Sequence, residues 1–290
     1  MGGTASGRVA ALHPTAMDLH DPGTLRQFLK KHGLGADKSL GQHFLCSPRV
    51  ADAIRGRLTG VAGILEIGPG PGAIASVLAS EVRTYRAVEL DRRFVPALAD
   101  CAPAAEVLLM DVLRAPLGEI LSGLPEPRAV VSNMPYNITG PLLTRIAENR
   151  NLFSKAVLMM QKEVAQRVLA PPGHSDRGSL SVFLQLQFAI VKVADVPPGA
   201  FLPPPKVDST VLEMVPIPDR VDADLLELIR AGFRQPRKTL ENNLVGVWPD
   251  RRSAKNAIAA VGLDEKVRPH ALRNEDWRSL TLRWQAERGP

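Results

Sequence analysis

The sequence predicts an α/β fold with a small all-α C-terminal domain, and three observations carry this prediction. Short apolar runs recur at the spacing of βα units, and each is followed by a polar side chain: Glu89, Asp111 or Asn133. A glycine loop, residues 68–72, separates the first apolar run from a helix-like segment. Beyond residues 217–218, apolar residues follow helical spacing instead.

The first unit joins an apolar run at residues 64–67 to a helix expected over residues 73–79. Between them stands Gly68-Pro69-Gly70-Pro71-Gly72, whose glycines let the backbone approach a ligand closely. The loop is neither a phosphate-binding P-loop nor Gly-x-Gly-x-x-Gly. Its two prolines donate no N–H to a phosphate. The loop therefore favours a nucleoside cofactor without phosphates, of which S-adenosylmethionine is the common one.

Acidic residues follow the next two apolar runs. Glu89 directly follows the run at residues 82–88. It lies about twenty residues beyond the glycine loop, the offset at which an acidic side chain can accept hydrogen bonds from ribose hydroxyls. Asp111 follows residues 107–109 and Met110. A lone acid after a strand is usually solvated. The ordered series of glycine loop, Glu89, Asp111 and Asn133 predicts one binding site, because ligands bind at the carboxyl ends of the strands in such sheets.

The segment Asn133-Met134-Pro135-Tyr136 follows the apolar run at residues 129–131. The Asn133 side chain and the Met134 backbone carbonyl offer two acceptors, and Pro135 biases Met134 toward an extended conformation. Tyr136 adds a flat ring for stacking. Two acceptors beside a ring suit an exocyclic amine on a planar heterocycle such as adenine. A β-turn with a half-buried tyrosine is the alternative interpretation.

The composition favours a polyanionic partner. The 290 residues carry a formal net charge of +6, suggest roughly two domains, and are 45% hydrophobic. Basic residues form two groups on either side of the predicted base site, with solvated helix faces as the alternative interpretation. The groups are Arg26, Lys30, Lys31, Lys38, Arg49, Arg55 and Arg57, and Arg230, Arg234, Arg237, Lys238, Arg251, Arg252 and Lys255.

Neither a metal site nor a membrane span is expected. Cys46 and Cys101 are the only cysteines, and no His-x-x-x-His pair occurs. No run of eighteen apolar residues exists, and residues 1–20 lack the sustained apolar core of a secretory signal. We therefore expect a cytoplasmic protein. We also expect it to act as a monomer.

The chain divides into three parts in this interpretation. Residues 1–21 are expected to be a disordered extension, 22–216 a ligand-binding domain whose first part (22–60) is basic and helical, and 217–290 an α-helical C-terminal domain. Within the middle part, residues 179–196 are compatible with either helix or strand, and 197–205 are rich in proline. Strands are expected at 156–160 and 207–215, and helices at 162–169, 222–233, 237–244, 251–261 and 275–284.

Together these residues resemble the class I methyltransferases, and more narrowly the family of ribosomal RNA adenine dimethyltransferases. The similarity runs in family order from about residue 24 to the C-terminal region. The matching stretches are residues 38–45 (KSLGQHFL), 65–72 (LEIGPGPG), 88–91 (VELD), 133–137 (NMPYN), 160–163 (MQKE), 201–209 (FLPPPKVDS) and 233–240 (FRQPRKTL).

The resemblance implies a Rossmann-like class I methyltransferase sheet and an enzyme that uses S-adenosylmethionine to dimethylate N6 of two adjacent adenosines. These adenosines would lie in a loop near the 3′ end of small-subunit ribosomal RNA, in the assembling small subunit. By this resemblance Tyr136 and Phe201 sandwich the target base. The implied residues are Asn133, Met134, Tyr136 and Phe201 for catalysis; His43, Leu45, Gly68, Gly70, Glu89, Asp111 and Asn133 for the cofactor; and Lys206, Arg234, Arg237 and Lys238 for RNA.

The chain departs from the family pattern at four of its positions. His43 stands where the family usually has Asn, at a position that contacts the cofactor. Met134 and Pro71 each replace a common Leu. Pro236 interrupts a basic run and removes one charge, which weakens the case for RNA contact by that segment.

Three other functions remain as alternatives. One is methylation of large-subunit RNA, as in the antibiotic-resistance relatives, against which residues 206–209 and the helical segment around 233–240 argue. Another is DNA adenine methylation, against which Met134 and the lack of a recognisable DNA-reading domain argue. The last is a non-catalytic RNA-binding or assembly factor, which the intact Glu89, Asp111, Asn133 and Tyr136 disfavour.

Overall fold

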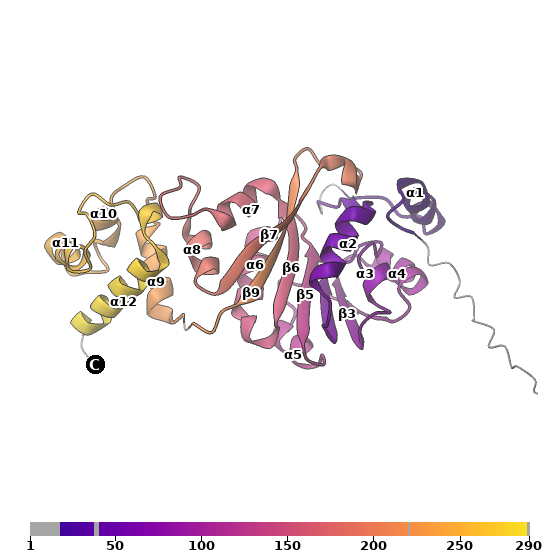
Figure 1. Cartoon of the computed structure of the whole chain (residues 1–290), viewed down its shortest axis with the longest axis horizontal. Coiled ribbons are helices and arrows are strands. Elements are labelled where there is room, and N and C mark those ends of the chain that lie inside the picture. Colours follow the sequence, from indigo (N-terminus) through magenta and orange to yellow (C-terminus); the bar gives the residue numbers. More distant parts are fainter. Residues whose placement is uncertain (1–17, 38–40, 220, 289–290) are drawn as a thin grey trace, which may run out of the picture.

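The computed structural model describes residues 18–37, 41–219 and 221–288. Its centre is a seven-stranded sheet with the order β4-β3-β2-β5-β6-β9-β7 (Figure 1). The first five of these strands are parallel, and β9 runs antiparallel to both β6 and β7. The strands are β2 (Gly63–Ile67), β3 (Thr84–Glu89), β4 (Ala105–Leu109), β5 (Arg128–Asn133), β6 (Lys155–Gln161), β7 (Phe188–Val196) and β9 (Ser209–Pro216). The predicted α/β fold is confirmed.

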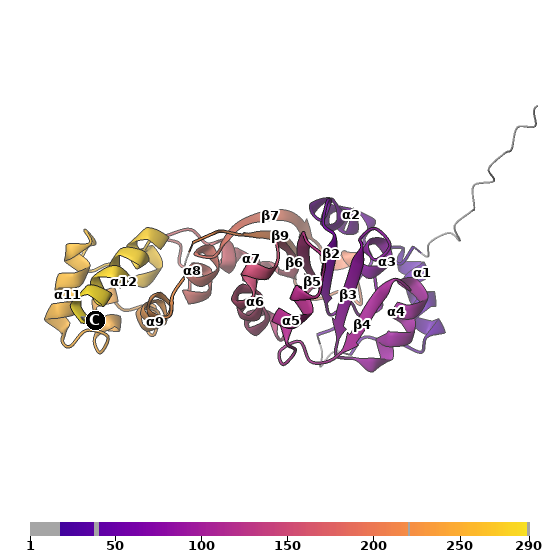
Figure 2. The ribbon, with the colours of Figure 1, turned by 90° about the horizontal axis from the view of Figure 1, so that it is seen from below.

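Helices cover both faces of the sheet (Figure 2). Successive strand residues point to opposite faces, so Ile64 packs in one apolar core and Leu65 in another. The first core includes side chains of α1 (Pro22–Lys31), α2 (Pro48–Arg57), α3 (Ala75–Leu78) and α4 (Val95–Cys101). The second includes side chains of α5 (Leu117–Ser122), α6 (Thr139–Glu148), α7 (Lys162–Leu169) and α8 (Ser179–Gln185).

A third core lies at one end of the long molecule, among the C-terminal helices (Figure 1). Its helices are α9 (Ala223–Gly232), α10 (Leu240–Leu244), α11 (Arg251–Ala260) and α12 (Asn274–Arg288). The rings of Phe233 and Trp277 stack there with centroids 5.7 Å apart. Val182 and Leu186, from α8 and its C-terminal cap, also belong to this core. The boundary at residue 217 stays a prediction.

The predicted elements differ from the observed ones mainly at their ends. The helix at 162–169 is confirmed as α7, and residues 179–196 contain both alternatives, a helix (α8) followed by a strand (β7). The helix expected over 237–244 begins only at Leu240, because the preceding residues form a turn in which the Gln235 N–H donates to Asn243 Oδ1 at 2.7 Å. The described residues also form four 3₁₀ turns: Arg92–Phe94, Arg150–Leu152, Pro198–Ala200 and Pro269–Ala271.

A two-stranded sheet that the sequence did not predict joins β1 (Phe44–Leu45) to β8 (Phe201–Leu202). Residues 1–17 of the predicted extension (1–21) and the first three residues of the 38–45 motif lie outside the described residues. The last residues of that extension are described: Leu19 is buried in the first apolar core, and Asp21 caps the start of α1. Within the described ranges, no helix is long and apolar enough to cross a lipid bilayer.

Candidate active site

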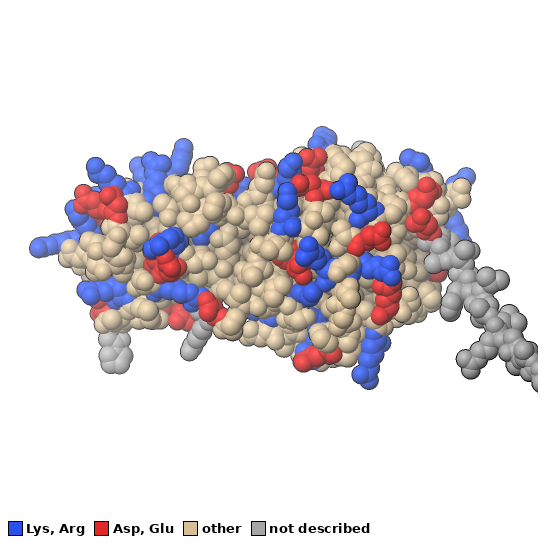
Figure 3. All heavy atoms as spheres, viewed as in Figure 1, with Lys and Arg blue, Asp and Glu red and all other residues tan. Residues whose placement is uncertain are grey.

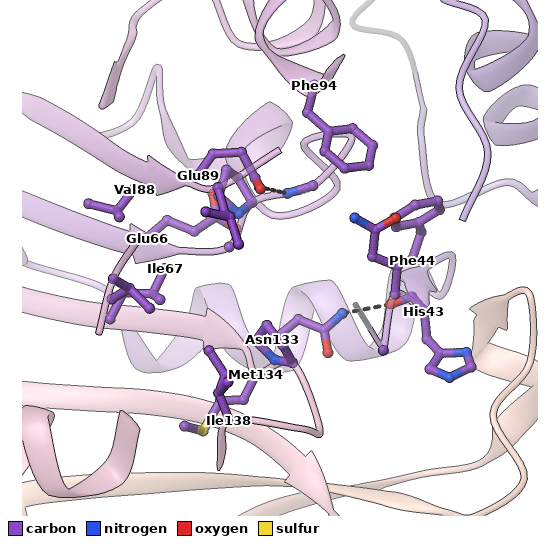
Figure 4. A pocket seen from close by; sticks show the side chains of 18 of the residues that line it. His43, Phe44, Glu66, Ile67, Val88, Glu89, Phe94, Asn133, Met134 and Ile138 are labelled. Carbon is purple, nitrogen blue, oxygen red and sulfur yellow. Dashed lines mark hydrogen bonds between the residues drawn. The ribbon is translucent and has the colours of Figure 1, made fainter. Parts of the chain in front are cut away.

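A cavity of about 230 Å³ opens at the carboxyl ends of β2, β3, β4 and β5 (Figure 4). Gly68 follows β2, Glu89 ends β3 and Asn133 ends β5, so parallel strands bring together residues that are far apart in sequence. Every residue predicted to bind the cofactor lines this cavity: His43, Leu45, Gly68, Gly70, Glu89, Asp111 and Asn133.

The glycine loop takes a conformation that other residues rarely adopt. Gly68 and Gly70 have φ of +68° and +55°, and Gly72 has φ of +96°. A Cβ on Gly72 would lie only 2.5 Å from Cys101 Sγ, so this glycine also packs the loop against α4. The loop is also hydrogen-bonded to the end of β3, because the Gly70 N–H donates to Glu89 Oε2 at 3.0 Å (Figure 4).

Glu89 is 6% exposed and its two carboxyl oxygens have different partners. Oε2 accepts from Gly70, and Oε1 accepts from the Asp91 N–H at 2.8 Å. Burial raises the pKa of this carboxyl, against the backbone N–H groups that favour its charged form. Each oxygen retains lone pairs for further donors, as gripping ribose hydroxyls requires.

Asp111 lies beside β4 and is more open. Its Oδ1 accepts from the Leu113 N–H at 2.8 Å, which fixes the side chain, and its Oδ2 lies 3.8 Å from Arg114 Nε. Two neighbouring residues that the sequence did not single out also line the cavity, Leu90 and Val112. Leu90 is 58% exposed despite its apolar side chain. Apolar residues directly after acidic strand ends are the signal that could have identified both.

Glu66 is a further cavity residue that the sequence did not reveal, because it stands inside the apolar run of β2. It is 1% exposed, and Tyr85 Oη donates to its Oε2 at 2.7 Å. Burial raises the pKa of Glu66 to about 8. The floor of the cavity therefore holds a carboxyl whose neutral form is favoured near neutral pH.

The Asn133 amide is held in one orientation. Its Nδ2 donates to the backbone oxygen of His43 at 2.9 Å, which leaves Oδ1 as an acceptor beside the cavity (Figure 4). Met134 is anchored by its N–H, which donates to the Met159 carbonyl at 2.9 Å, and its side chain is buried. Tyr136 lines the cavity, and its hydroxyl lies 2.7 Å from Ser209 Oγ.

Phe201, the second ring of the predicted base sandwich, is buried beside the cavity-lining segment 43–45 and does not itself line the cofactor cavity. It is 3% exposed, packs in the first apolar core and is absent from the residues that line the cavity. The reason is its place in β8, where it pairs with Leu45 of β1. The described ring next to Tyr136 is instead that of His43, with centroids 5.5 Å apart and planes inclined by 30°.

The residues predicted to bind RNA are all exposed and lie outside the cavity. None of these side chains forms an ion pair with a described residue: Lys206, Arg234, Arg237 and Lys238. Basic side chains are numerous over the C-terminal helices on the face seen in Figure 3. The structure therefore does not bring these residues into the cofactor site.

The donor and acceptor set of the cavity fits a nucleoside cofactor such as S-adenosylmethionine. Glu89 offers a carboxylate to a diol, Asp111 offers an acceptor to an amine, and Leu90 and Val112 offer apolar contact. The positive φ at Gly68 and Gly70 gives the close backbone approach. In the part of the chain that the structure describes, no three His, Cys, Asp or Glu side chains gather in a way that could hold a metal ion.

Comparison with known proteins gives consistent results. The family model described as ribosomal RNA adenine dimethylase matches residues 34–285. A protein named ribosomal RNA small subunit methyltransferase A from Geobacter sulfurreducens is 44% identical over 196 residues, 65% of this chain and 71% of that protein. A protein of the same name from Phenylobacterium zucineum is 40% identical over 206 residues, 69% of this chain and 71% of that protein.

Two solved structures share the fold. A dimethyladenosine transferase from Plasmodium falciparum superposes with a TM-score of 0.71 at 25% identity, over 83% of this chain and 97% of that one. The 23S rRNA methyltransferase ErmE superposes with a TM-score of 0.63 at 25% identity, over 83% of this chain and 98% of that one.

Proposed function

The chain belongs to the ribosomal RNA adenine dimethylase family, and from this premise we propose its substrate and the roles of its residues. It is an S-adenosylmethionine-dependent adenine-N6,N6-dimethyltransferase that acts on two adjacent adenosines in a loop near the 3′ end of small-subunit ribosomal RNA. The proteins from Geobacter sulfurreducens and Phenylobacterium zucineum carry a name that refers to the small subunit.

The orientation of Asn133 is the observation that carries the proposal. Its Nδ2 is committed to the His43 backbone, so Oδ1 is the atom left to accept a hydrogen bond at the edge of the cavity. The Met134 backbone oxygen is the second proposed acceptor, and no hydrogen bond from a described residue reaches it. Two acceptors would hold both N–H groups of an adenine amine and favour its pyramidal, nucleophilic geometry in the transition state.

The remaining roles follow from the same geometry. S-adenosylmethionine supplies an activated methyl group when bound, so the residues around it act mainly by positioning the amine for in-line transfer. Glu89 and Asp111 hold the nucleoside, with His43, Leu45, Gly68 and Gly70 around it. Tyr136 offers a ring to the target base, which leaves its stack more readily in an RNA loop than in a helix. Phe201 is the second ring proposed for the target base, and its side chain, 3% exposed here, would have to become accessible to the base.

The RNA partner is proposed from the exposed cations. Lys206 extends from the segment before β9, and the C-terminal helices contribute Arg234, Arg237 and Lys238. Such side chains neutralise phosphates, so binding is expected to weaken steeply with salt. In this proposal residues 22–216 form the methyltransferase domain and 217–290 an RNA-contacting domain of a cytoplasmic monomer that binds the assembling small subunit.

A methylation assay tests the proposal. The protein is incubated with S-adenosylmethionine and either unmethylated small subunits or naked large-subunit RNA, and nucleosides are identified by mass spectrometry. We expect N6,N6-dimethyladenosine only in small-subunit RNA, and none with Asn133→Ala. Methylation of the large-subunit RNA alone would instead assign the function that the name of ErmE describes.

A further inference from the structure

Two segments that are about 160 residues apart in sequence are joined beside the cavity. Phe44 and Leu45 of β1 pair in an antiparallel arrangement with Leu202 and Phe201 of β8, and the Cys46 N–H donates to the Ala200 carbonyl at 2.8 Å. The first segment lines the cofactor cavity, whereas the second leads into the exposed loop that carries Lys206. This small sheet is therefore a direct link between the two predicted binding regions.

The His43 side chain extends this link by one residue. Its Nδ1 lies 2.9 Å from the backbone oxygen of Pro203. A carbonyl oxygen only accepts, so Nδ1 carries the hydrogen and donates. At the other end of the same loop, the Lys162 N–H donates to the Asp208 carbonyl at 2.9 Å. The segment from 203 to 208 is therefore held at both ends, and His43 is the side chain that holds its start.

The backbone of His43, in contrast to its side chain, contacts the proposed catalytic residue Asn133. Its carbonyl oxygen accepts from Asn133 Nδ2, the bond that orients the proposed acceptor. Its ring also lies next to the Tyr136 ring. Figure 4 shows that His43 and Glu89 lie at opposite ends of the labelled set of residues, with the imidazole directed away from Glu89. The side chain is thus placed for the loop rather than for the ribose end of the cavity.

We propose that His43 is a positioning residue that couples the cofactor cavity to the loop at residues 203–208 through its hydrogen bond to Pro203. This inference rests on the proposed function, because the loop is taken to contact the RNA substrate. It also explains how the chain can tolerate His where the family pattern has Asn. In Asn and in His the donor nitrogen is attached to Cγ, so either residue can place an N–H at the same distance from the backbone.

The substitutions that test this role remove, keep or move the side-chain N–H that donates to Pro203. His43→Ala removes it, His43→Asn keeps a donor on the Cγ atom, and His43→Gln moves the donor one bond further out. His174→Ala is a matched control, because His174 is an exposed histidine that does not line the cavity. For each protein we would measure the KM for small subunits, the Kd for S-adenosylmethionine, and the Kd for small subunits with and without S-adenosylhomocysteine.

We expect His43→Ala and His43→Gln to raise the KM for small subunits by about fivefold, the effect of one lost hydrogen bond. The coupling predicts that S-adenosylhomocysteine raises RNA affinity and that this gain shrinks in both variants, while the Kd for S-adenosylmethionine alone changes by a smaller factor than the KM. His43→Asn should restore the KM. Thermal unfolding checks that the variants are folded. If His43→Ala does not fold, His43→Gln alone tests the loss of the donor.

Three results would overturn the inference. One is an unchanged KM and an unchanged effect of S-adenosylhomocysteine in both His43→Ala and His43→Gln. Another is a loss confined to S-adenosylmethionine affinity, which would make His43 a simple cofactor contact. The third is a failure of His43→Asn to restore the KM. Failure of the wild-type protein to methylate small subunits would instead refute the proposed function.

Discussion

The buried carboxyl of Glu66 should make the stability of this protein depend on pH. The side chain is 1% exposed and accepts a hydrogen bond from Tyr85, and burial raises its pKa from 4.5 to about 8. The folded protein therefore keeps this carboxyl protonated over a pH range in which the unfolded chain has it ionised.

The sign and size of the effect follow from proton linkage. Between pH 4.5 and about 8 the folded state binds more protons at Glu66 than the unfolded state does, so the free energy of unfolding falls as pH rises. One pKa unit corresponds to about 1.4 kcal/mol, which gives an upper limit of about 5 kcal/mol for the whole range. Between about pH 5.5 and about pH 7.5 the expected loss is roughly 2 kcal/mol.

Urea unfolding of the wild type and of Glu66→Gln at several pH values measures this loss. Glutamine has the shape of a protonated glutamate, still accepts from Tyr85, and does not titrate. Other carboxyls titrate in both proteins, so the difference between the two curves isolates Glu66. We expect the curve of Glu66→Gln to be flatter, so that this variant becomes relatively more stable as pH rises. Parallel curves would refute the reasoning, because they would mean that folding does not change the protonation of Glu66 in this range.

Other substitutions test the site and the C-terminal core. Glu89→Ala should weaken S-adenosylmethionine binding by about 1–3 kcal/mol in calorimetry, because it removes the acceptor of buried donors; RNA affinity should hardly change, and wild-type cofactor affinity would exclude Glu89 from the site. Asn133→Ala should lower turnover by orders of magnitude with cofactor affinity within a few-fold, since its acceptor acts mainly in the transition state; near-normal turnover would contradict that role. Gly232→Ala should lower stability by about 1–3 kcal/mol in thermal unfolding, because its Cβ would lie 2.4 Å from Trp277 Cη2, and an unchanged melting temperature would show that Trp277 can move aside.

The sheet and the cofactor cavity could be predicted from the sequence because both depend on a repeated local pattern. An apolar run followed by a polar residue marks the carboxyl end of a buried strand, and parallel strands bring such ends to one edge. Glu89, Asp111 and Asn133 could therefore be grouped before their contacts were known. The same pattern cannot reveal Glu66, whose place inside an apolar run gives no sign that a cavity reaches it.

Contacts between distant segments are the part that could not be predicted. The pairing of β1 with β8 involves only two residues on each side, too few to leave a periodic signal. Phe201 is buried in that pairing, and the His43 ring lies beside Tyr136, a contact that the sequence did not predict. Helix ends were also misplaced where a side chain competes for the backbone, as Asn243 does at Gln235.

The α8 helix ties the sheet to the C-terminal helices, which limits how the protein could be divided into separately folded fragments. Leu184 of α8 packs in the second core of the sheet, whereas Val182 and Leu186 pack among the C-terminal helices. Arg177, just before α8, reinforces the junction by donating to Asn274 Oδ1 at 2.8 Å. Ending a fragment at Pro216 would remove Val182 and Leu186 from the core of the C-terminal helices. The same cut would expose these apolar side chains on the fragment that contains the sheet. Recombinant dissection should therefore fail at the linker that looks most natural in the sequence.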